Sequence, residues 1–216
     1  MTVLILTGGT IFADQLKKSG FCPSEALIIA ADSGYNNARK LGLVPDLLLG
    51  DLDSIDRSGL KPHELDHLEK IIVPAIKDDT DTQLAVDTAI SRGADELIII
   101  GGLGGRLDHT LSTVFLLEYI ERKKVSAVIT DGKNRVRLLR AEGELVRLNV
   151  APGFKYLSLV SITDTCENVS VSGVFYPLNN ATLERCYSYA VSNEITADHA
   201  GISLTKGSLL VIESGD

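Results

Sequence analysis

Two aspartates, Asp51 and Asp53, have the residue type and the spacing to do chemistry together. They follow the apolar run 47–49, which is typical of a buried parallel strand, so both carboxylates are expected at its carboxyl end. Open α/β sheets bind ligands at this end. Carboxylates this close repel each other, and Mg²⁺ would neutralise them, since it prefers carboxylate, water and phosphate oxygens. The alternative is a polar turn in which one aspartate caps the next element.

Two further aspartates, Asp32 and Asp81, come after other predicted strands. Asp32 follows strand 26–31, and Asp81 follows strand 71–73 through a polar segment. Because a parallel sheet gathers the carboxyl ends of its strands at one edge, we expect both side chains to face the crevice of the first two aspartates.

The segment around Asp81 also has a purely structural interpretation. Thr80 and Gln83 fit a capping box, and an acidic residue in the first helical turn suits the helix dipole. Helix initiation alone is therefore one interpretation of this polar segment; the other is that Asp81 also faces the crevice from the helix N-terminus.

A glycine-rich loop, 101–105, joins the predicted strand 96–100 to a helix that begins near Leu107. In such an arrangement backbone N–H groups and a helix N-terminus hold phosphate, although the loop is neither a Walker A loop nor Gly-x-Gly-x-x-Gly. Arg106 offers a planar charged fork for phosphate oxygens. The alternatives are a plain tight turn and, for Arg106, a surface salt bridge to a nearby aspartate.

The first part of the chain predicts the scaffold that would position these residues. Short apolar runs alternate with helical patterns, which indicates βαβ units and a mostly parallel, Rossmann-like sheet with helices. We expect this α/β domain to span residues 1–131. Its predicted strands are 2–6, 26–31, 47–50, 71–73, 96–100 and 125–130, and its clearest helices are 80–92 and 107–123.

After residue 131 the pattern changes to short strand-like runs separated by glycines and turns. We predict a second, all-β domain over 132–216, of sandwich or barrel type, that packs on the first domain or on a partner subunit. Its predicted strands are 135–139, 145–150, 156–162, 169–172, 202–205 and 208–212.

Composition narrows the function classes. A net charge of -8 and a pI near 5.0 argue against nucleic acid or an anionic membrane as the main partner. Cys22, Cys166 and Cys186 are far apart, which predicts no disulfide framework or zinc site and favours a reducing cytoplasm. No apolar run is long enough for a signal peptide or a membrane span. His63 and His67 have a metal-binding spacing without a third ligand, so a solvated helix surface is favoured.

Taken together, these motifs resemble those of the thiamin pyrophosphokinase family, whose members transfer a diphosphate group from ATP to thiamin and release AMP. The similarity follows the order of the motifs along nearly the whole chain. The motifs are Ala31-Asp32-Ser33-Gly34, Gly50-Asp51-Leu52-Asp53-Ser54, Lys77-Asp78-Asp79-Thr80-Asp81, residues 101–109, Tyr176-Pro177-Leu178 and Ser192-Asn193-Glu194.

The resemblance implies an α/β domain that binds Mg²⁺ and ATP, a β-sandwich that helps to bind thiamin, and a homodimer with clefts between subunits. It implies metal and catalytic roles for acidic and basic side chains: Asp32, Asp51, Asp53, Asp81 and Arg106, with Mg²⁺ on Asp51, Asp53 and Asp81. It implies nucleotide contacts at Gly102, Gly104, Arg106, Asp108 and His109, and thiamin contacts at Tyr176, Ser192 and Asn193.

The sequence departs from the family pattern in two places. Thr113 stands where the family often has asparagine, and the chain has no tryptophan, so an aromatic platform for thiamin must be Phe175 or Tyr176. One alternative function is diphosphate transfer to another alcohol, such as a pterin. The other is non-catalytic nucleotide binding, against which four carboxylates around one crevice argue.

Overall fold

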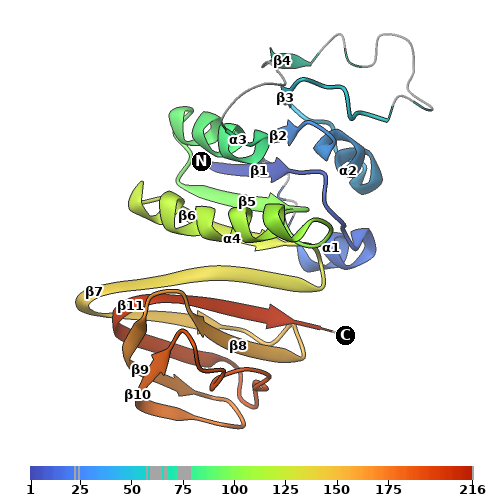
Figure 1. Ribbon diagram of the computed structural model, residues 1–216. Coiled ribbons are helices and arrows are strands. Elements are labelled where there is room, and N and C mark those ends of the chain that lie inside the picture. Colours follow the sequence, from blue (N-terminus) through green and yellow to red (C-terminus); the bar gives the residue numbers. More distant parts are fainter. Residues whose placement is uncertain are drawn as a thin grey trace. The chain divides into compact units, whose positions relative to one another are not determined.

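The computed structural model describes residues 1–21, 23, 25–56, 58, 65, 68–72 and 79–215. The chain forms two compact units, Met1–Gly132 and Lys133–Asp216 (Figure 1). Among the helices of the described residues, none has the length and apolar character to cross a membrane.

The first unit is built on a parallel sheet with the strand order β6-β5-β1-β2-β3-β4. The strands are β1 (Thr2–Leu6), β2 (Leu27–Ala31), β3 (Leu47–Gly50), β4 (Glu69–Ile72), β5 (Glu96–Ile100) and β6 (Ser126–Thr130). The central strands are continuously apolar because both faces of the sheet are covered. From β1 the chain adds strands in one direction up to β4 and then returns to the other side of β1 with β5. Such a reversal of strand order is where open α/β sheets form a ligand crevice.

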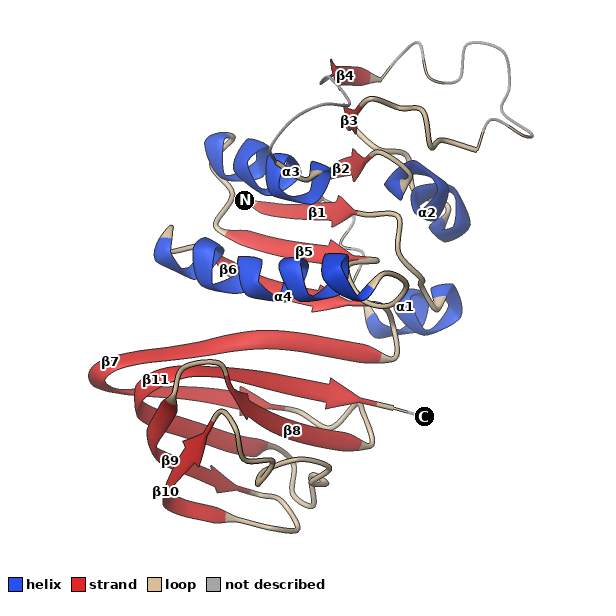
Figure 2. Cartoon of the chain, in the orientation of Figure 1, coloured by secondary structure: helices blue, strands red, loops and turns tan. Residues whose placement is uncertain are grey.

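In the described part of the first unit, four helices cover this sheet: α1 (Ala13–Ser19), α2 (Gly34–Leu41), α3 (Asp81–Ser91) and α4 (Leu107–Arg122). Leu16 of α1 and Ala38 of α2 share one buried cluster with Leu4 and Leu6 of β1. Helices α3 and α4 lie side by side (Figure 2), where the Tyr119 hydroxyl donates a hydrogen bond to Asp87 at 2.6 Å.

Helix α3 begins where the sequence predicts. The Thr80 hydroxyl accepts a hydrogen bond from the Gln83 N–H at 3.1 Å, which confirms Thr80 as the N-cap. The Gln83 side chain does not complete a capping box, because its amide donates to Asp87 at 3.0 Å instead.

The second unit contains the strands β7 (Asn134–Val150), β8 (Tyr156–Ser161), β9 (Thr165–Ser172), β10 (Leu178–Glu184) and β11 (Ala200–Ser214), and their mutual pairings are antiparallel. Alternate residues of these strands form one apolar core. The sequence predicts strand breaks near Gly143 and Gly207, and this is wrong: β7 and β11 run through them as one long pair. Both glycines have a positive φ, and a register shift lies beside Gly207, so they bend the strands without ending them.

Candidate functional site

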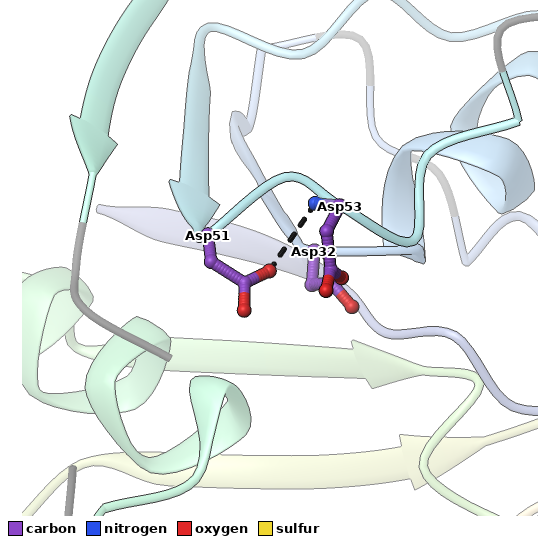
Figure 3. A group of neighbouring side chains, drawn as sticks. All are labelled: Asp32, Asp51 and Asp53. Atoms are coloured by element: carbon purple, nitrogen blue, oxygen red, sulfur yellow. Dashed lines mark hydrogen bonds between the residues drawn. The ribbon is translucent and has the colours of Figure 1, made fainter. Parts of the chain in front are cut away.

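Three aspartates from two strand ends form one cluster in the first unit. Ligand oxygens of Asp32, Asp51 and Asp53 lie within 4.8 Å of one another, and Figure 3 shows the side chains grouped beside the loop that follows β3. The Asp53 N–H donates to Asp51 at 3.2 Å, and the Ser54 hydroxyl donates to Asp53 at 2.8 Å. This group, the aspartate cluster, offers the carboxylate oxygens that hard divalent cations prefer.

Unusual backbone conformations aim these carboxylates at one another. Asp32 has a φ of 47° directly after β2, and its N–H donates to the Leu49 carbonyl oxygen of β3 at 2.7 Å. Leu52, between the two other aspartates, has a φ of 63°. Left-handed conformations of non-glycine residues cost free energy and concentrate at functional sites. These strained conformations thus bring three acidic side chains together.

Asp32 is the electrostatically perturbed member of the aspartate cluster. Burial raises the pKa of its carboxyl group most, and the nearby charges of Asp81 and Asp51 raise it further. Its Oδ1 atom is buried and has no hydrogen-bond partner among the described residues. A buried, unpaired carboxylate oxygen is unfavourable by itself, so this atom fits a cation.

Asp81 lies beside the aspartate cluster rather than in it. It is the first residue of α3, and its Oδ1 lies 3.3 Å from the point that a Cβ atom on Gly50 would occupy. Gly50 has a φ of 135°, which other residues rarely adopt, so glycine lets β3 end close to this carboxylate. The predicted metal set of Asp51, Asp53 and Asp81 therefore differs from the observed grouping, in which Asp32 takes the place of Asp81.

A cavity of about 600 Å³ opens beside these carboxylates. The loops after the parallel strands β1, β2 and β5 line it, together with Ser54 of the loop after β3 and the start of α3 at 80–82. Asp32, Asp81, Arg106 and His109 all contribute to its wall. The expected gathering of polar residues at one edge of the sheet is thus observed, and the volume suits a nucleotide-sized ligand.

The glycine loop after β5 forms one wall of the cavity. A Cβ atom on Gly102 would lie 2.7 Å from Cγ2 of Thr113, so only glycine lets the loop pack on α4 there. Gly104 also lines the cavity and has a φ of 78°. The Thr113 hydroxyl donates to the His109 carbonyl oxygen of its own helix at 2.8 Å.

Arg106 and Asp108 form a two-armed ion pair at the start of α4. Arg106 donates from Nη2 to Asp108 at 2.6 Å and from Nε at 3.1 Å, and both side chains are largely exposed. The Asp108 carboxylate also accepts from the His109 N–H at 3.0 Å. The expected alternative for Arg106, a salt bridge to a nearby aspartate, is therefore observed together with its position on the cavity wall.

This ion pair has a measurable signature. The Arg106 guanidinium, followed by the His109 N–H, lowers the pKa of Asp108 to about 2. The ionised carboxylate therefore stabilises the folded state at pH values above the ordinary carboxyl pKa, and this stabilisation is lost as the pH falls from there through about 2. We expect an NMR titration of the Asp108 carboxyl carbon to give this low midpoint. In Arg106→Ala the midpoint should rise towards 3.8, the ordinary value. An unmoved midpoint would show that the pair does not persist in solution.

The loop after β1 belongs to the site without having been predicted from the sequence. Its residues Thr7, Gly8, Gly9 and Thr10 line the cavity next to the glycine loop. A Cβ atom on Gly9 would lie 2.1 Å from the Gly101 carbonyl oxygen, which accepts the Gly9 N–H at 3.0 Å. The signal was present, because two glycines follow an apolar strand here after one threonine, much as two glycines follow β5 directly.

Asn37 of α2 holds this loop in place. It is 2% exposed, and its Nδ2 donates to the carbonyl oxygens of Thr7 at 2.7 Å and Gly9 at 2.8 Å. Asn36 acts similarly on the loop after β3, since it donates to the Ser54 carbonyl oxygen at 3.3 Å. Neighbouring asparagines of one helix thus fix two of the loops around the site.

We expect Asn37→Leu to lower the free energy of unfolding by about 2–4 kcal/mol, because two carbonyl oxygens in this confined loop lose their donor. Urea denaturation measures this. Lys40→Met is the matched control, because it removes only the 3.3 Å contact from Lys40 to Asn37 and keeps both donations to the loop. Equal stability of Asn37→Leu and the control would contradict the proposed support.

The residues expected on the thiamin side lie in the second unit. Tyr176 and Asn193 line an apolar pocket of about 340 Å³ together with Tyr189 and Leu178. Ser192 is adjacent, with a φ of 58°, and its N–H donates to the Ser158 hydroxyl at 2.9 Å. Of the other sequence predictions, those on Cys22, His63, His67, Lys77 and Asp78 lie outside the described residues.

Two family models match the chain. Residues 21–129 match the thiamin pyrophosphokinase catalytic domain, and residues 145–209 match the vitamin B1 binding domain of thiamin pyrophosphokinase. The chain belongs to the thiamin pyrophosphokinase family. The expected family and its activity, diphosphate transfer from ATP to thiamin, are therefore confirmed.

Individual relatives agree with this family assignment. The chain is 28% identical to the thiamine pyrophosphokinase of Bacillus subtilis over 100% of its own length and 99% of that protein. The crystal structure of the Bacillus subtilis thiamine pyrophosphokinase superposes with a TM-score of 0.84 at 26% identity, with both chains covered completely. The thiamin pyrophosphokinase family protein of Enterococcus faecalis gives a TM-score of 0.79 at 27% identity, again over 100% of both chains.

These similarities confirm the mixed α/β class for this member of the thiamin pyrophosphokinase family. They also cover both units, since the two matched regions fall on opposite sides of Gly132.

Proposed function

We propose that the aspartate cluster binds Mg²⁺ and that this thiamin pyrophosphokinase family member transfers diphosphate from ATP in the cavity beside it. The main support for this proposal is that three carboxylates converge beside this cavity. One of their oxygens, Oδ1 of Asp32, is buried and has no hydrogen-bond partner among the described residues. Such a donor set fits a hard divalent cation, and Asp32, Asp51 and Asp53 would be its ligands. When bound, Mg²⁺ supplies charge neutralisation for the phosphate oxygens.

The chain itself aligns the nucleotide. The two glycine loops, after β1 and after β5, lie side by side on the cavity wall, and close backbone approach to phosphate is what such loops provide. Arg106 lies at the start of α4, and its guanidinium now donates to Asp108. In this proposal the same N–H groups donate to phosphate oxygens when ATP binds. Phosphoryl transfer depends mainly on such alignment and charge stabilisation.

The thiamin hydroxyl attacks the β-phosphorus of ATP in this proposal, and AMP leaves. The sequence left Asp32 and Asp81 as alternative acceptors of the hydroxyl proton. Both line the cavity, but only Asp32 is part of the aspartate cluster. This difference favours Asp81 as the proton acceptor and Asp32 as a metal ligand.

The second unit carries the thiamin side in this proposal. Because the chain has no tryptophan, Tyr176, which lines the apolar pocket, supplies the aromatic wall for thiamin. Ser192 lies between two residues of the pocket lining, Val191 and Asn193. Five further features stay predictions of the same proposal. They are the Rossmann-like description of the first unit, the β-sandwich description of the second, the boundary near residue 131, the homodimer and the cytoplasmic location.

The deciding experiment follows AMP release from ATP and Mg²⁺ with each candidate alcohol. We expect AMP and thiamin diphosphate in equal amounts with thiamin, and no AMP with a pterin alcohol. AMP release only with the pterin would favour the alternative substrate. Isothermal titration that detects ATP binding, without AMP release from any alcohol, would favour a non-catalytic nucleotide-binding protein.

A further inference from the structure

Asn193 connects three segments of the second unit. Its main chain pairs with Leu157 of β8, because its N–H donates at 3.0 Å and its carbonyl oxygen accepts at 2.7 Å. On its other side, Val174 and Phe175 run alongside the chain that follows Asn193. In that antiparallel contact Val174 pairs with Ile195, and the Phe175 N–H donates to the Glu194 carbonyl oxygen at 2.9 Å.

The side chain of Asn193 continues this contact by one more residue. The backbone of Asn193 is already bonded to Leu157, so it cannot also pair with Tyr176. Instead, Oδ1 of Asn193 accepts the Tyr176 N–H at 3.0 Å, and Nδ2 donates to the Tyr176 carbonyl oxygen at 2.7 Å. The carboxamide thus acts as a second peptide group and fixes the backbone of Tyr176 on both sides.

These bonds leave the Asn193 side chain little capacity for a ligand. Its Oδ1 also accepts the Glu194 N–H at 3.0 Å, so both acceptor positions are used and a single Nδ2 hydrogen remains. Tyr176, by contrast, is 67% exposed, and its side chain lines the apolar pocket. An exposed aromatic side chain contributes most to binding when its backbone is already ordered, because less conformational entropy is then lost on association.

We propose that Asn193 is a positioning residue that acts on thiamin through Tyr176 and not through a direct contact. The inference rests on the proposed function in one respect, that thiamin is the ligand of this pocket. Tyr176 is the aromatic wall that touches the ligand, and the Asn193 carboxamide sets its position. Asn193 is therefore needed for specificity even though its own polar atoms are mostly engaged by the protein.

The chain offers a clean probe because it contains no tryptophan. Tyr176→Trp places a single fluorescent reporter on the pocket wall of the full-length protein. In this background we expect Asn193→Ala to lower the fluorescence anisotropy of the free protein and to weaken thiamin binding about tenfold, which corresponds to the loss of one or two ordered hydrogen bonds. ATP binding should stay the same, because the nucleotide cavity belongs to the first unit.

A direct contact predicts a different pattern. Thiamin binding would then weaken while the anisotropy and the emission spectrum of the ligand-free protein stayed unchanged, and this would overturn the proposal. Asn168→Ala is the matched control, since Asn168 donates to the Thr205 hydroxyl at 2.8 Å, also has a positive φ, and lies outside the pocket lining. It should cost similar stability and leave both the anisotropy and the thiamin affinity unchanged.

A double-mutant cycle tests the same inference with the native tyrosine. The thiamin KM is measured for Asn193→Ala, Tyr176→Ala and the double variant. A positioning role predicts that Asn193→Ala adds almost nothing once Tyr176 is truncated, whereas independent contacts predict multiplied effects and would refute it. If the parent protein releases no AMP with thiamin, the proposed function fails, but the anisotropy of the free reporter protein still tests whether Asn193 orders residue 176.

Discussion

Replacing Asp51 or Asp53 with asparagine is expected to lower turnover about a thousandfold, because a metal that neutralises phosphate charge supplies several kcal/mol of transition-state stabilisation. Both carboxylates belong to the aspartate cluster, and asparagine keeps their size while it removes the charge. Steady-state AMP release at saturating ATP and thiamin measures the effect.

The same variants should fold at least as well as the parent protein. Without a cation, three carboxylates within 4.8 Å repel each other, so removing one charge relieves the folded state. Thermal unfolding with and without Mg²⁺ separates the two effects: Mg²⁺ should raise the unfolding midpoint of the parent and not that of Asp51→Asn.

Asp56→Asn is the matched control for these two variants. Asp56 is an exposed carboxylate on the same loop, and it accepts a hydrogen bond from the Ser58 N–H at 2.9 Å outside the aspartate cluster. It should keep full turnover and the Mg²⁺ response. Turnover of Asp51→Asn and Asp53→Asn equal to that of the control would remove the proposed metal site.

The second large effect is expected at Arg106. Arg106→Ala should lower kcat/KM for ATP about a hundredfold, the typical loss when one charged donor to a developing phosphate charge is removed. Arg106→Lys should restore little, because lysine lacks the two-armed fork that now engages Asp108. The helix itself should persist, since the Arg106 carbonyl oxygen keeps its bond from the Thr110 N–H at 3.1 Å.

Arg122→Ala is the matched control at the other end of the same helix. It removes an equal charge far along α4 from the cavity wall and should leave the ATP parameters unchanged. If Arg106→Ala retained both the parent KM for ATP and the parent turnover, the ion pair with Asp108 would be a surface feature without a role in phosphate binding.

Local sequence patterns determined several elements of the first unit. The apolar runs before Asp32 and Asp51 are strands, Thr80 caps α3, and the glycine loop leads into α4. These features depend on neighbouring residues, since alternation, capping and turn preference act over a few positions of the chain. The polar residues that follow the strands meet at one edge because parallel strands leave no other arrangement.

The second unit was less predictable for a local reason. Gly143 and Gly207 look like turn residues in the sequence, but the pairing of β7 with β11 continues past both. Glycine tolerates a bend within a strand as readily as a turn, so only the long-range pairing could distinguish the two.

Distances between loops were decided by tertiary structure alone. All four aspartates were expected at one crevice, and the resemblance implied Mg²⁺ on Asp51, Asp53 and Asp81, whereas in the folded chain Asp32 groups with Asp51 and Asp53. The partners of Asn37 and Asn193 could not be predicted from the sequence either. The side-chain amide of Asn37 bonds to Gly9, 28 positions away, and that of Asn193 bonds to Tyr176, 17 positions away. The sequence by itself therefore determined which residues reach the edge of the sheet and which family the chain resembles. Only packing decided which of these residues touch, because close contacts between loops depend on the shapes of glycine turns and on buried amides that no local pattern records.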